Sequence, residues 1–360
     1  MKKYFIFAVA AVVALAACTK NEVDLSTQKD HSINFAVVTG KNTKAPIESN
    51  YYPNNIPFGV FCYALTTGTW AANSSTAQLY MDNETVSYNE TDDANGIYAP
   101  AHTYFWPLSG SLTFVAYSPK NTTGTVAHDK ANKVLTVTDF TVNSSAASQQ
   151  DLMYSDTNAD CQENTNGQVG HYNDGTTNDT PSTKTGVNIV FHHALSQVKF
   201  NVKKAAGLDD YTIKVNAISF HAKNKGTLTV TNDSPSWGTS AAYISGTGAF
   251  DYIAGSGLEV EAPNNSATSF ATFGDANMPV PQALNAADQT FTVTYSLSKG
   301  SVNLGQKTTD PVDLLGDTVT AWAPNTIYNY NIVIDLKKIY FNPTVEPWTT
   351  PEQNQNVNVE

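Results

Sequence analysis

The stretch Val187–Lys203, which reads VNIVFHHALSQVKFNVK, constrains the fold more than any other part of the chain. Its apolar residues recur with a period of two, the spacing of a β-strand with one buried face. The apolar positions are odd-numbered up to Leu195 and even-numbered from Val198 onward. This change predicts either a β-bulge near residues 194–197 or a strand covered on opposite faces at its two ends. We expect a second domain to begin with this stretch.

Short alternating runs of the same kind recur along the chain, separated by Gly, Pro, Asn and Ser. Only 14% of the residues are charged, whereas Tyr and Phe are plentiful, which is typical of an all-β protein. No segment shows sustained helical periodicity, and residues 203–210 could form one turn at most. The strands expected from these patterns are Ile33–Val38, Phe58–Ala64, Leu112–Ser118, Tyr211–Val215, Ile218–Phe220, Gly226–Val230, Thr290–Tyr295 and Tyr328–Leu336.

Residues 1–17 have the features of a lipoprotein signal peptide. Lys2 and Lys3 precede an apolar run of 14 residues, shorter than the roughly 20 that span a bilayer as a helix. The run ends in Leu15-Ala16-Ala17-Cys18, which looks like a lipobox. We therefore expect Cys18 to be acylated and to become the mature N-terminus, with an ordinary signal peptide and a chance Cys as the alternative. The polar residues 18–32 are predicted to be a tether.

The charge of the chain argues against nucleic acid as a partner. Removal of Lys2 and Lys3 leaves 18 Lys against 32 acidic residues, a net charge of −14. Nucleic-acid-binding proteins carry basic patches instead. All 20 basic residues are Lys, so no guanidinium group is present to bind phosphate or carboxylate in a bidentate way.

Cysteine, histidine and acidic residues give no convincing metal or redox motif. Cys62 lies in an apolar strand and is expected to be a buried thiol, while Cys161 falls in polar sequence; their spacing leaves a disulfide open. Neighbours on a strand point to opposite faces, so His192 and His193 are expected to be structural. The loop Asp156–Asp160 begins like a calcium loop but has Cys161 where Gly is needed, which leaves only weak calcium binding open.

Catalytic motifs are not found in the sequence. It contains no Gly-x-Ser-x-Gly, no phosphate-binding Gly-rich loop and no Cys-x-x-Cys, so we expect no enzyme, no cofactor and no bound metal. A hydrolase would need clustered carboxylates, and the adjacent pairs Asp92–Asp93 and Asp209–Asp210 lie in turn-like sequence where they point apart.

A series of short motifs occurs in one order along the chain. They are the lipobox at Cys18, Thr43-Lys44-Ala45, Tyr104-Phe-Trp-Pro107, Leu112–Pro119, Asp151-Leu-Met-Tyr-Ser155, the Val187–Lys203 stretch, Met278–Gln282 and Trp322–Trp348. In this order they resemble the fimbrillin family, the type V pilin subunits and related surface lipoproteins of gut and oral bacteria. The resemblance implies two tandem transthyretin-like β-sandwich domains, at 33–160 and 187–348. A polar linker or loop at 161–186 would join them, and residues 349–360 would form a polar tail.

The resemblance also implies assembly by strand exchange at the cell surface, with an anchor in the outer membrane. Proteolysis near Lys44 and Ala45 would free the first strand, and other pilin subunits would fill the vacated groove by β-strand addition. Family members usually have Thr-Arg-Ala at this position, so an Arg-specific protease cannot mature this chain. The displaced strand would contribute Ile33, Phe35, Val37 and Val38. The candidate donor strand contains Ile339, Phe341 and Val345.

The C-terminal tail is a weak donor, since Val357 and Val359 are its only apolar residues beyond Trp348. This favours a tip or accessory subunit over a stalk subunit. The alternative is a non-polymerising surface lipoprotein that binds glycans or host proteins. For that role the aromatic residues in loop-like sequence are the candidates, namely Trp70, Trp237, Tyr51 and Tyr52.

Overall fold

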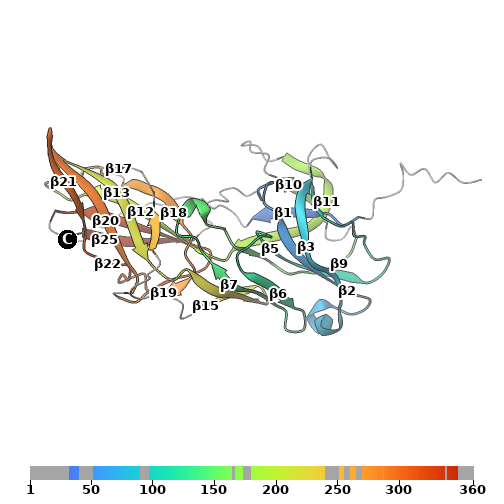
Figure 1. Ribbon diagram of the computed structural model, residues 1–360. Helices are drawn as coiled ribbons and strands as arrows, with labels where there is room; N and C mark the ends of the chain where they lie inside the picture. The colour runs from blue at the N-terminus through green and yellow to red at the C-terminus, as the bar shows by residue number, and fades with distance from the viewer. Residues whose placement is uncertain are drawn as a thin grey trace, which may run out of the picture.

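The computed structural model describes residues 32–39, 52–89, 97–163, 167–172, 180–239, 251–254, 260–264, 270–286, 288–336 and 339–347. These residues are mostly β-strands, which form an elongated molecule (Figure 1). The helical elements among them are α1 (Trp70–Asn73) and two 3₁₀ turns, η1 (Ser74–Thr76) and η2 (Ala146–Ser148). The prediction of an all-β fold is confirmed. No helix among the described residues is long and apolar enough to cross a membrane.

The N-terminal half contains a closed ring of seven strands. Successive neighbours in the ring are β1, β4, β3, β2, β5, β8 and β11, and β11 pairs with β1 to close it. Two further strands, β9 and β10, pair with β5 and β11 outside the ring. The strands of this barrel are β1 (Phe35–Thr39), β2 (Phe58–Leu65), β3 (Gln78–Asn89), β4 (Ile97–Pro100), β5 (Ser111–Ser118), β8 (Met153–Ser155), β9 (Asn158–Cys161), β10 (Gly167–Tyr172) and β11 (Thr180–His193).

The C-terminal half is a sandwich of two sheets. One sheet has the order β18-β12-β24-β25, and the other has the order β16-β13-β20-β21 with β17 and β22 alongside. Phe200 of the first sheet contacts Phe220 and Phe291 of the second. The strands are β12 (Ser196–Lys204), β13 (Tyr211–His221), β16 (Asp251–Ala254), β17 (Val260–Glu261), β18 (Ala271–Asn277), β20 (Thr290–Lys299), β21 (Val302–Thr308), β22 (Val312–Asp313), β24 (Thr326–Ile334) and β25 (Ile339–Pro347), with a small pair β19 (Gln282–Ala283) and β23 (Ala321–Trp322).

A third sheet joins the two halves. Its order is β15-β14-β7-β6, so strands from both halves of the sequence pair within it. We call it the bridging sheet. Its strands are β6 (Thr125–Asp129), β7 (Val134–Thr141), β14 (Lys225–Thr231) and β15 (Ser234–Thr239). The two halves therefore share main-chain hydrogen bonds, which two independent domains in series would not do.

The stretch 187–203 is two strands and not one. Val187 and Phe191 belong to β11 and are buried in the barrel core, whereas Val198 and Phe200 belong to β12 and are buried in the core of the sandwich. The chain passes from one half to the other at Ala194, so the two parities of the apolar spacing face two different cores. Placing the start of the second domain at Val187 was therefore wrong, because the first part of the stretch pairs with β1 and β8.

Part of the segment predicted as a linker or loop, 161–186, is also strand. β10 and the first half of β11 form an antiparallel pair, with Val169 opposite Thr185. Thr and Tyr in this segment favour extended backbone, and main-chain pairing does not require apolar side chains. Sparse apolar residues were therefore a poor guide to the absence of strands here.

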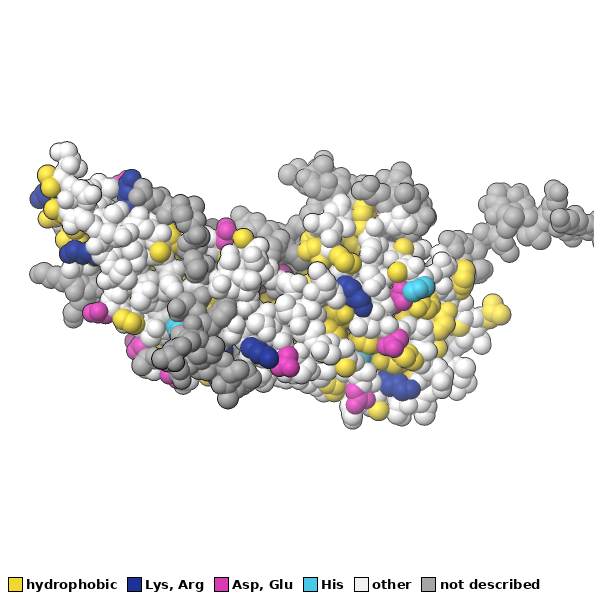
Figure 2. All heavy atoms as spheres, viewed as in Figure 1, with side chains coloured by type: hydrophobic (Ala, Val, Ile, Leu, Met, Phe, Trp, Pro, Cys, Tyr) yellow, Lys and Arg dark blue, Asp and Glu magenta, His cyan; other side chains and the backbone are white. Residues whose placement is uncertain are grey.

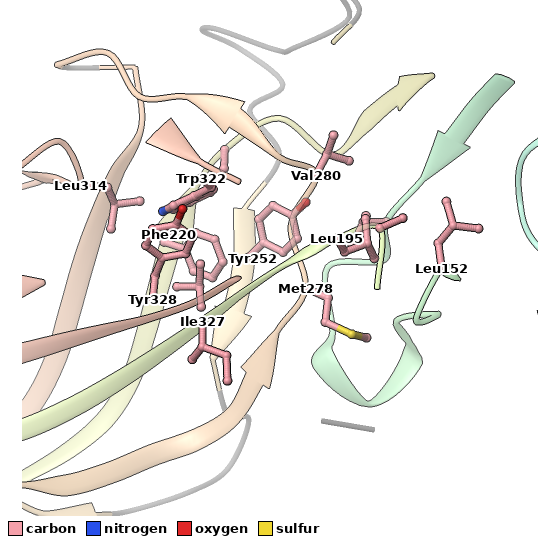
Figure 3. Close-up of a cluster of buried hydrophobic side chains, with 14 of the residues drawn as sticks. Leu152, Leu195, Phe220, Tyr252, Met278, Val280, Leu314, Trp322, Ile327 and Tyr328 are labelled. Carbon is pink, nitrogen blue, oxygen red and sulfur yellow. The ribbon is translucent and has the colours of Figure 1, made fainter. Parts of the chain in front are cut away.

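The buried side chains form two clusters. One lies inside the barrel, and the other runs from the outer wall of the barrel beneath the bridging sheet into the sandwich. Figure 3 shows part of the second cluster, where Leu152 from the barrel half and Leu195 lie near Met278 and Val280. Such a shared core makes the two halves depend on each other for stability.

Candidate functional site: the first strand of the barrel

β1 has one long and one short main-chain interface. It runs parallel to β11 over five register pairs, from Phe35 opposite Val187 to Thr39 opposite Phe191. Its antiparallel pairing with β4 has a single register pair, Phe35 opposite Tyr98. The ring of the barrel is therefore most weakly joined between β1 and β4.

The inward side chains of β1 complete the barrel core. Ile33, two residues before β1, and Phe35 and Val37 within it are buried. The ring of Phe35 meets Phe58 and Phe114 edge to face with centroids 5.9 and 5.7 Å away. Burying one such side chain contributes about 1.5–3 kcal/mol, so the three together contribute about 5–9 kcal/mol. That sum approaches the whole stability of a typical domain. Loss of β1 without replacement would therefore open the core.

A strap formed by residues 101–106 lies over the start of β1. The carbonyl oxygen of Tyr104 accepts a hydrogen bond from the backbone N–H of Ile33 at 2.8 Å. Ser32 forms an isolated antiparallel bridge with Phe105. The strap thus pairs with the residues that precede β1, beyond the point where β4 ends.

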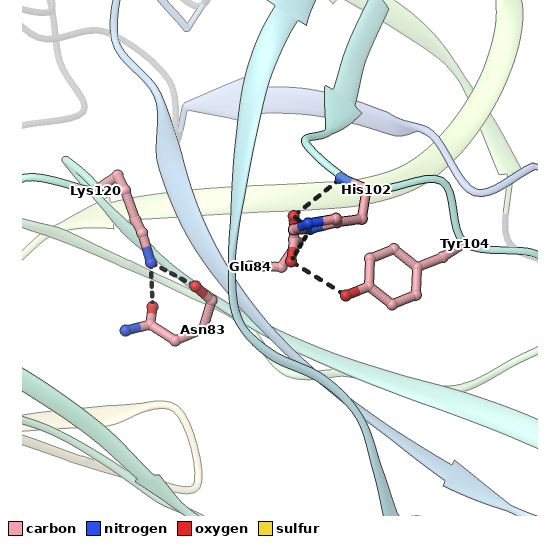
Figure 4. A network of polar contacts seen from close by, with 5 residues as sticks. All are labelled: Asn83, Glu84, His102, Tyr104 and Lys120. Atoms are coloured by element: carbon pink, nitrogen blue, oxygen red, sulfur yellow. Dashed lines mark hydrogen bonds and ion pairs between the residues drawn. The ribbon is translucent and has the colours of Figure 1, made fainter.

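The strap is fastened to β3 through Glu84, which is buried. One carboxylate oxygen accepts from the backbone N–H of His102 at 3.1 Å and lies 3.0 Å from its Nδ1, and the other accepts from the Tyr104 hydroxyl at 3.1 Å (Figure 4). Burial and the hydrogen bond to Glu84 raise the pKa of Tyr104. Beside Glu84, the Lys120 ammonium donates to the Asn83 side-chain oxygen at 2.8 Å. Glu84 therefore orients the strap against β1.

Gly186 allows β1 to approach β11 closely. A Cβ atom at this position would lie 2.7 Å from the backbone nitrogen of Ala36 and 2.7 Å from the carbonyl carbon of Phe35. Next to it, the N–H of Val187 donates to the carbonyl oxygen of Asn34 at 2.7 Å. A side chain at residue 186 would collide with backbone, which cannot move aside as a flexible side chain can.

The candidate donor strand lies in the other half of the molecule. β25 pairs with β24 over nine register pairs and forms the edge of its sheet. Val345 is 50% exposed, and nothing is described of the side chains of Ile339 and Phe341. The structure does not bring β25 near β1 within one chain. Among the other predicted site residues, Cys18, Lys44 and Ala45 lie outside the described residues, as does the side chain of Val38.

Cys62 and Cys161 are thiols buried in the barrel core. Cys161 ends β9, so its predicted place in a polar loop was wrong. Cys62 and Cys161 lie on opposite sides of β5, in register with Phe114 and Leu112. Two strand spacings amount to about 10 Å, beyond the roughly 7 Å between Cα atoms that a disulfide can join. Burial raises the pKa of Cys62 well above its usual value.

The adjacent histidines have separate partners, as expected for neighbours on a strand. Nε2 of His192 lies 2.8 Å from Asp156, and Nδ1 of the buried His193 lies 2.9 Å from Asp151. The hydrogen bond that His192 donates to the Asp156 carboxylate raises the pKa of His192. The structural interpretation of this pair agrees with these contacts.

The residues of the calcium-like loop are used by the protein itself. Besides Asp156, Asp160 accepts a hydrogen bond from the backbone N–H of Trp70 at 2.8 Å. Within the described part of the chain, no group of three or more His, Cys, Asp or Glu side chains could bind a metal ion. Of the adjacent carboxylate pairs, Asp92–Asp93 lies outside the described residues, and Asp210 is exposed, 4.0 Å from Lys299.

Of the four aromatic residues proposed for glycan binding, the three that the structure describes are not gathered on a surface. Trp70 is buried at the start of α1 and stacks on Tyr63, and Tyr52 is buried in the barrel core. Their predicted exposure in loops was wrong, because both segments fold onto aromatic neighbours. Trp237 is half-buried in β15, where its Nε1 donates to the carbonyl oxygen of Ala194 at 2.7 Å. Tyr51 lies outside the described residues.

Comparisons with known proteins identify a family. A family model described as fimbrillin-like matches residues 43–348, which is most of the chain. A fimbrial protein from Bacteroides vulgatus has a similar fold, with a TM-score of 0.62 at 18% identity over 88% of this chain and 99% of that one.

Two other solved structures match less well. A candidate cell adhesion protein from Bacteroides uniformis gives a TM-score of 0.49 at 16% identity, over 89% of this chain and 99% of that one. The fimbrial anchor protein Mfa2 from Porphyromonas gingivalis gives 0.30 at 11% identity, over 88% of this chain and 98% of that one. A search of curated proteins found no match.

Proposed function

Because the chain belongs to the fimbrillin-like family, we propose that it is a fimbrial subunit of the cell surface that assembles by exchange of its first strand. Cys18 carries the lipid anchor, and cleavage beside Lys44 and Ala45 separates β1 from the rest of the chain. A strand from a neighbouring subunit then occupies the vacated groove. The family is structural, which favours this role over catalysis.

The observation that carries the proposal is the position of β1 in the barrel. It is the first strand of the described chain, and its side chains fill the core while its pairing with β4 is limited to one register pair. After a cut behind it, β1 would be bound only by non-covalent contacts. The groove that it leaves would be apolar and bordered by β4 and β11, so that a new strand could bond to both.

The donor in this proposal is the last strand of a neighbouring subunit, which contains Ile339, Phe341 and Val345. In its own subunit β25 bonds to one strand only, so it can leave without opening the middle of a sheet. Pro343 and Pro347 interrupt the series of backbone N–H groups along β25, since Pro has no N–H to donate. Together with the polar tail, this favours a tip or accessory subunit over a stalk subunit.

Cleavage in vitro tests the proposal. The chain from residue 19 is treated with a lysine-specific protease, with and without an excess of a synthetic peptide of residues 32–39. We expect cleavage after Lys44 or Lys41 to yield oligomers that resist SDS, and the peptide to suppress them. A variant carrying both Lys41→Gln and Lys44→Gln is the control and should stay monomeric under the same treatment.

The proposal would be contradicted if the cut protein remains monomeric and the fragment that contains β1 stays bound to it. That result would favour the competing proposal, a non-polymerising lipoprotein that binds glycans or host proteins. The burial of Trp70 and Tyr52 removes two of the aromatic residues on which the competing proposal relied.

A further inference from the structure

Three large apolar side chains are exposed at one end of the barrel. Leu108 is 106% exposed, Phe105 54% and Leu79 52%. The hydroxyl of Tyr80 donates to the carbonyl oxygen of Phe105 at 2.7 Å, which joins the start of β3 to the end of the strap. We call Leu79, Tyr80, Phe105 and Leu108 the apolar patch. Figure 2 shows hydrophobic side chains gathered over the barrel on the face in view.

The pairing of the strands places these residues together at that end. Leu79 at the start of β3 is opposite Tyr63, and Leu65 two residues further along β2 is opposite Ser111 at the start of β5. Leu108 comes three residues before Ser111. The start of β3, the start of β5 and the end of the strap therefore meet at one end of the barrel.

The chemistry of the apolar patch fits a lipid interface. Neither residues 78–81 nor residues 104–110 contain a charged side chain. Tyr80 and Tyr104 pack edge to face with ring centroids 5.5 Å apart, and Trp106 packs on Phe114. Tyr and Trp at the border of exposed Leu and Phe are the combination found where proteins meet the headgroup region of a bilayer.

The N-terminal part of the chain brings the patch near a bilayer. Ser32, the first described residue, is bridged to Phe105 within the patch. Cys18 precedes Ser32 by 14 residues, which reach at most about 50 Å when fully extended. An acylated Cys18 therefore keeps the patch close to the membrane. The net charge of −14 after removal of Lys2 and Lys3 argues against attraction by anionic lipid as the cause of contact.

We propose that the apolar patch docks the anchored protein onto the phospholipid surface, so that the acyl chains and the patch bind the same membrane. This inference rests on the lipid anchoring in the proposed function. Two linked contacts bind far more persistently than either contact alone. The Phe35 end of β1, which follows Ser32, then faces the bilayer, and its Thr39 end points away from it.

A fluorescent label at the patch tests the docking. A hexahistidine tag replaces acylated Cys18 and tethers the full mature chain to phosphatidylcholine vesicles that contain a nickel-chelating lipid. An environment-sensitive dye is attached to Leu108→Cys, and Cys62 and Cys161 do not compete because both are buried. The control label is at Val302→Cys in β21, in the other half of the molecule, where Val302 is 58% exposed. We expect a blue shift and quenching by brominated lipid at 108 and neither at 302.

Release from the vesicles gives a second measurement. After imidazole breaks the nickel tether, the double variant Phe105→Ser, Leu108→Ser should leave the vesicles about tenfold faster than the unaltered chain. The matched variant Val302→Ser, Leu304→Ser should leave at the unaltered rate. Equal solvent exposure of both labels would overturn the proposal. So would shielding of the 108 label at rising protein concentration without vesicles, because the patch would then bind a second copy of the chain.

The tethered assay separates this inference from the proposed function. The nickel tether replaces the acyl anchor, and no strand is exchanged. A missing docking signal therefore overturns the docking of the patch and leaves the fimbrial role intact. Conversely, an unacylated Cys18 in cells would overturn the anchoring on which docking in cells depends, whatever the vesicles show.

Discussion

The first and last strands of the described chain are built into their sheets in opposite ways. β1 lies between two strands, and its inward side chains, Phe35 among them, are buried in the barrel core. β25 bonds to one strand along nine register pairs, and its Val345 is half exposed. β1 therefore contributes buried side chains and pairs along both of its edges, whereas β25 pairs along one edge only.

This difference suits an exchange of strands between subunits. Removing β1 leaves an apolar groove with two open edges, which water fills poorly and another strand fills well. Removing β25, an edge strand, leaves one open edge. A receptor site at the start of the chain and a donor at its end are what a strand-exchange polymer requires.

Truncation of the core side chain of β1 should have the largest effect. Phe35→Ala leaves a cavity among Phe58 and Phe114, and we expect the free energy of unfolding to fall by about 3–5 kcal/mol. Val345→Ala, at the exposed position of β25, should change it by less than about 0.5 kcal/mol. Urea unfolding of both variants measures the two values. Similar losses of unfolding free energy in the two variants would show that β1 and β25 do not differ in this way.

Crowding β1 from the neighbouring strand should rank second. Gly186→Ala places a methyl group against the β1 backbone, and we expect a loss of about 2–3 kcal/mol together with faster amide exchange in β1. The control is Gly238→Ala in β15, where a Cβ atom would meet nothing within 4 Å. Hydrogen exchange with mass spectrometry reports on β1 directly. Unchanged exchange in Gly186→Ala would mean that β1 does not depend on this close approach.

Acid should weaken the barrel wall and leave β25 unaffected. Burial lowers the pKa of His128, which stacks near Phe61 and Tyr63, to about 4. The unfolded chain binds a proton at this residue near pH 6.5, so stability is complete above that pH and falls as the pH drops towards 4. We expect about 1–2 kcal/mol to be lost between pH 7 and pH 5. Urea unfolding at the two pH values measures the loss. In His128→Gln, the difference between the two free energies of unfolding should be smaller by that amount.

The opposite pH dependence is expected of His192. Its pKa is raised by Asp156, so this pair stabilises the fold at low pH and loses its effect as the pH rises through the raised pKa. His192→Gln should therefore steepen the acid loss measured in the preceding comparison. A loss that becomes shallower would show that the ion pair does not stabilise the barrel.

Loosening the strap should have the smallest effect. Glu84→Gln keeps the size of the side chain but weakens its hydrogen bonds to His102 and Tyr104, with an expected cost of about 1 kcal/mol. Exchange of the Ile33 amide, which bonds to Tyr104 just before β1, should quicken more than exchange within β1. Asp82→Asn, at the exposed position two residues earlier, is the control. If the Ile33 amide exchanges equally fast in both variants, Glu84 does not help to hold β1 in the barrel.

Much of the strand order was predictable because period-two spacing reports burial on one face. Similar signals nevertheless had different structural causes. The parity change in 187–203 marks a passage between two cores, whereas Ile213 and Phe220, which also differ in parity, lie on one strand with a bulge after Val215. The sequence cannot distinguish the two, since both keep the alternation on either side of the change.

The site was predictable only in part for a similar reason. The apolar alternation in Ile33–Val38 indicated a buried strand, but the parallel partner of that strand, β11, lies some 150 residues away in the sequence. The roles of Glu84 and Gly186 depend on that long-range pairing, so neither residue stood out. The bridging sheet was missed because β14, the strand that pairs with β7, belongs to the other half of the sequence.

The mass and N-terminal sequence of the protein taken from the cell surface show whether β1 is an exchangeable strand. We expect assembled protein to begin at Ala45, or just after Lys41, and therefore to lack β1. Assembled protein that begins at acylated Cys18 and retains Ile33 to Val38 would contradict this expectation.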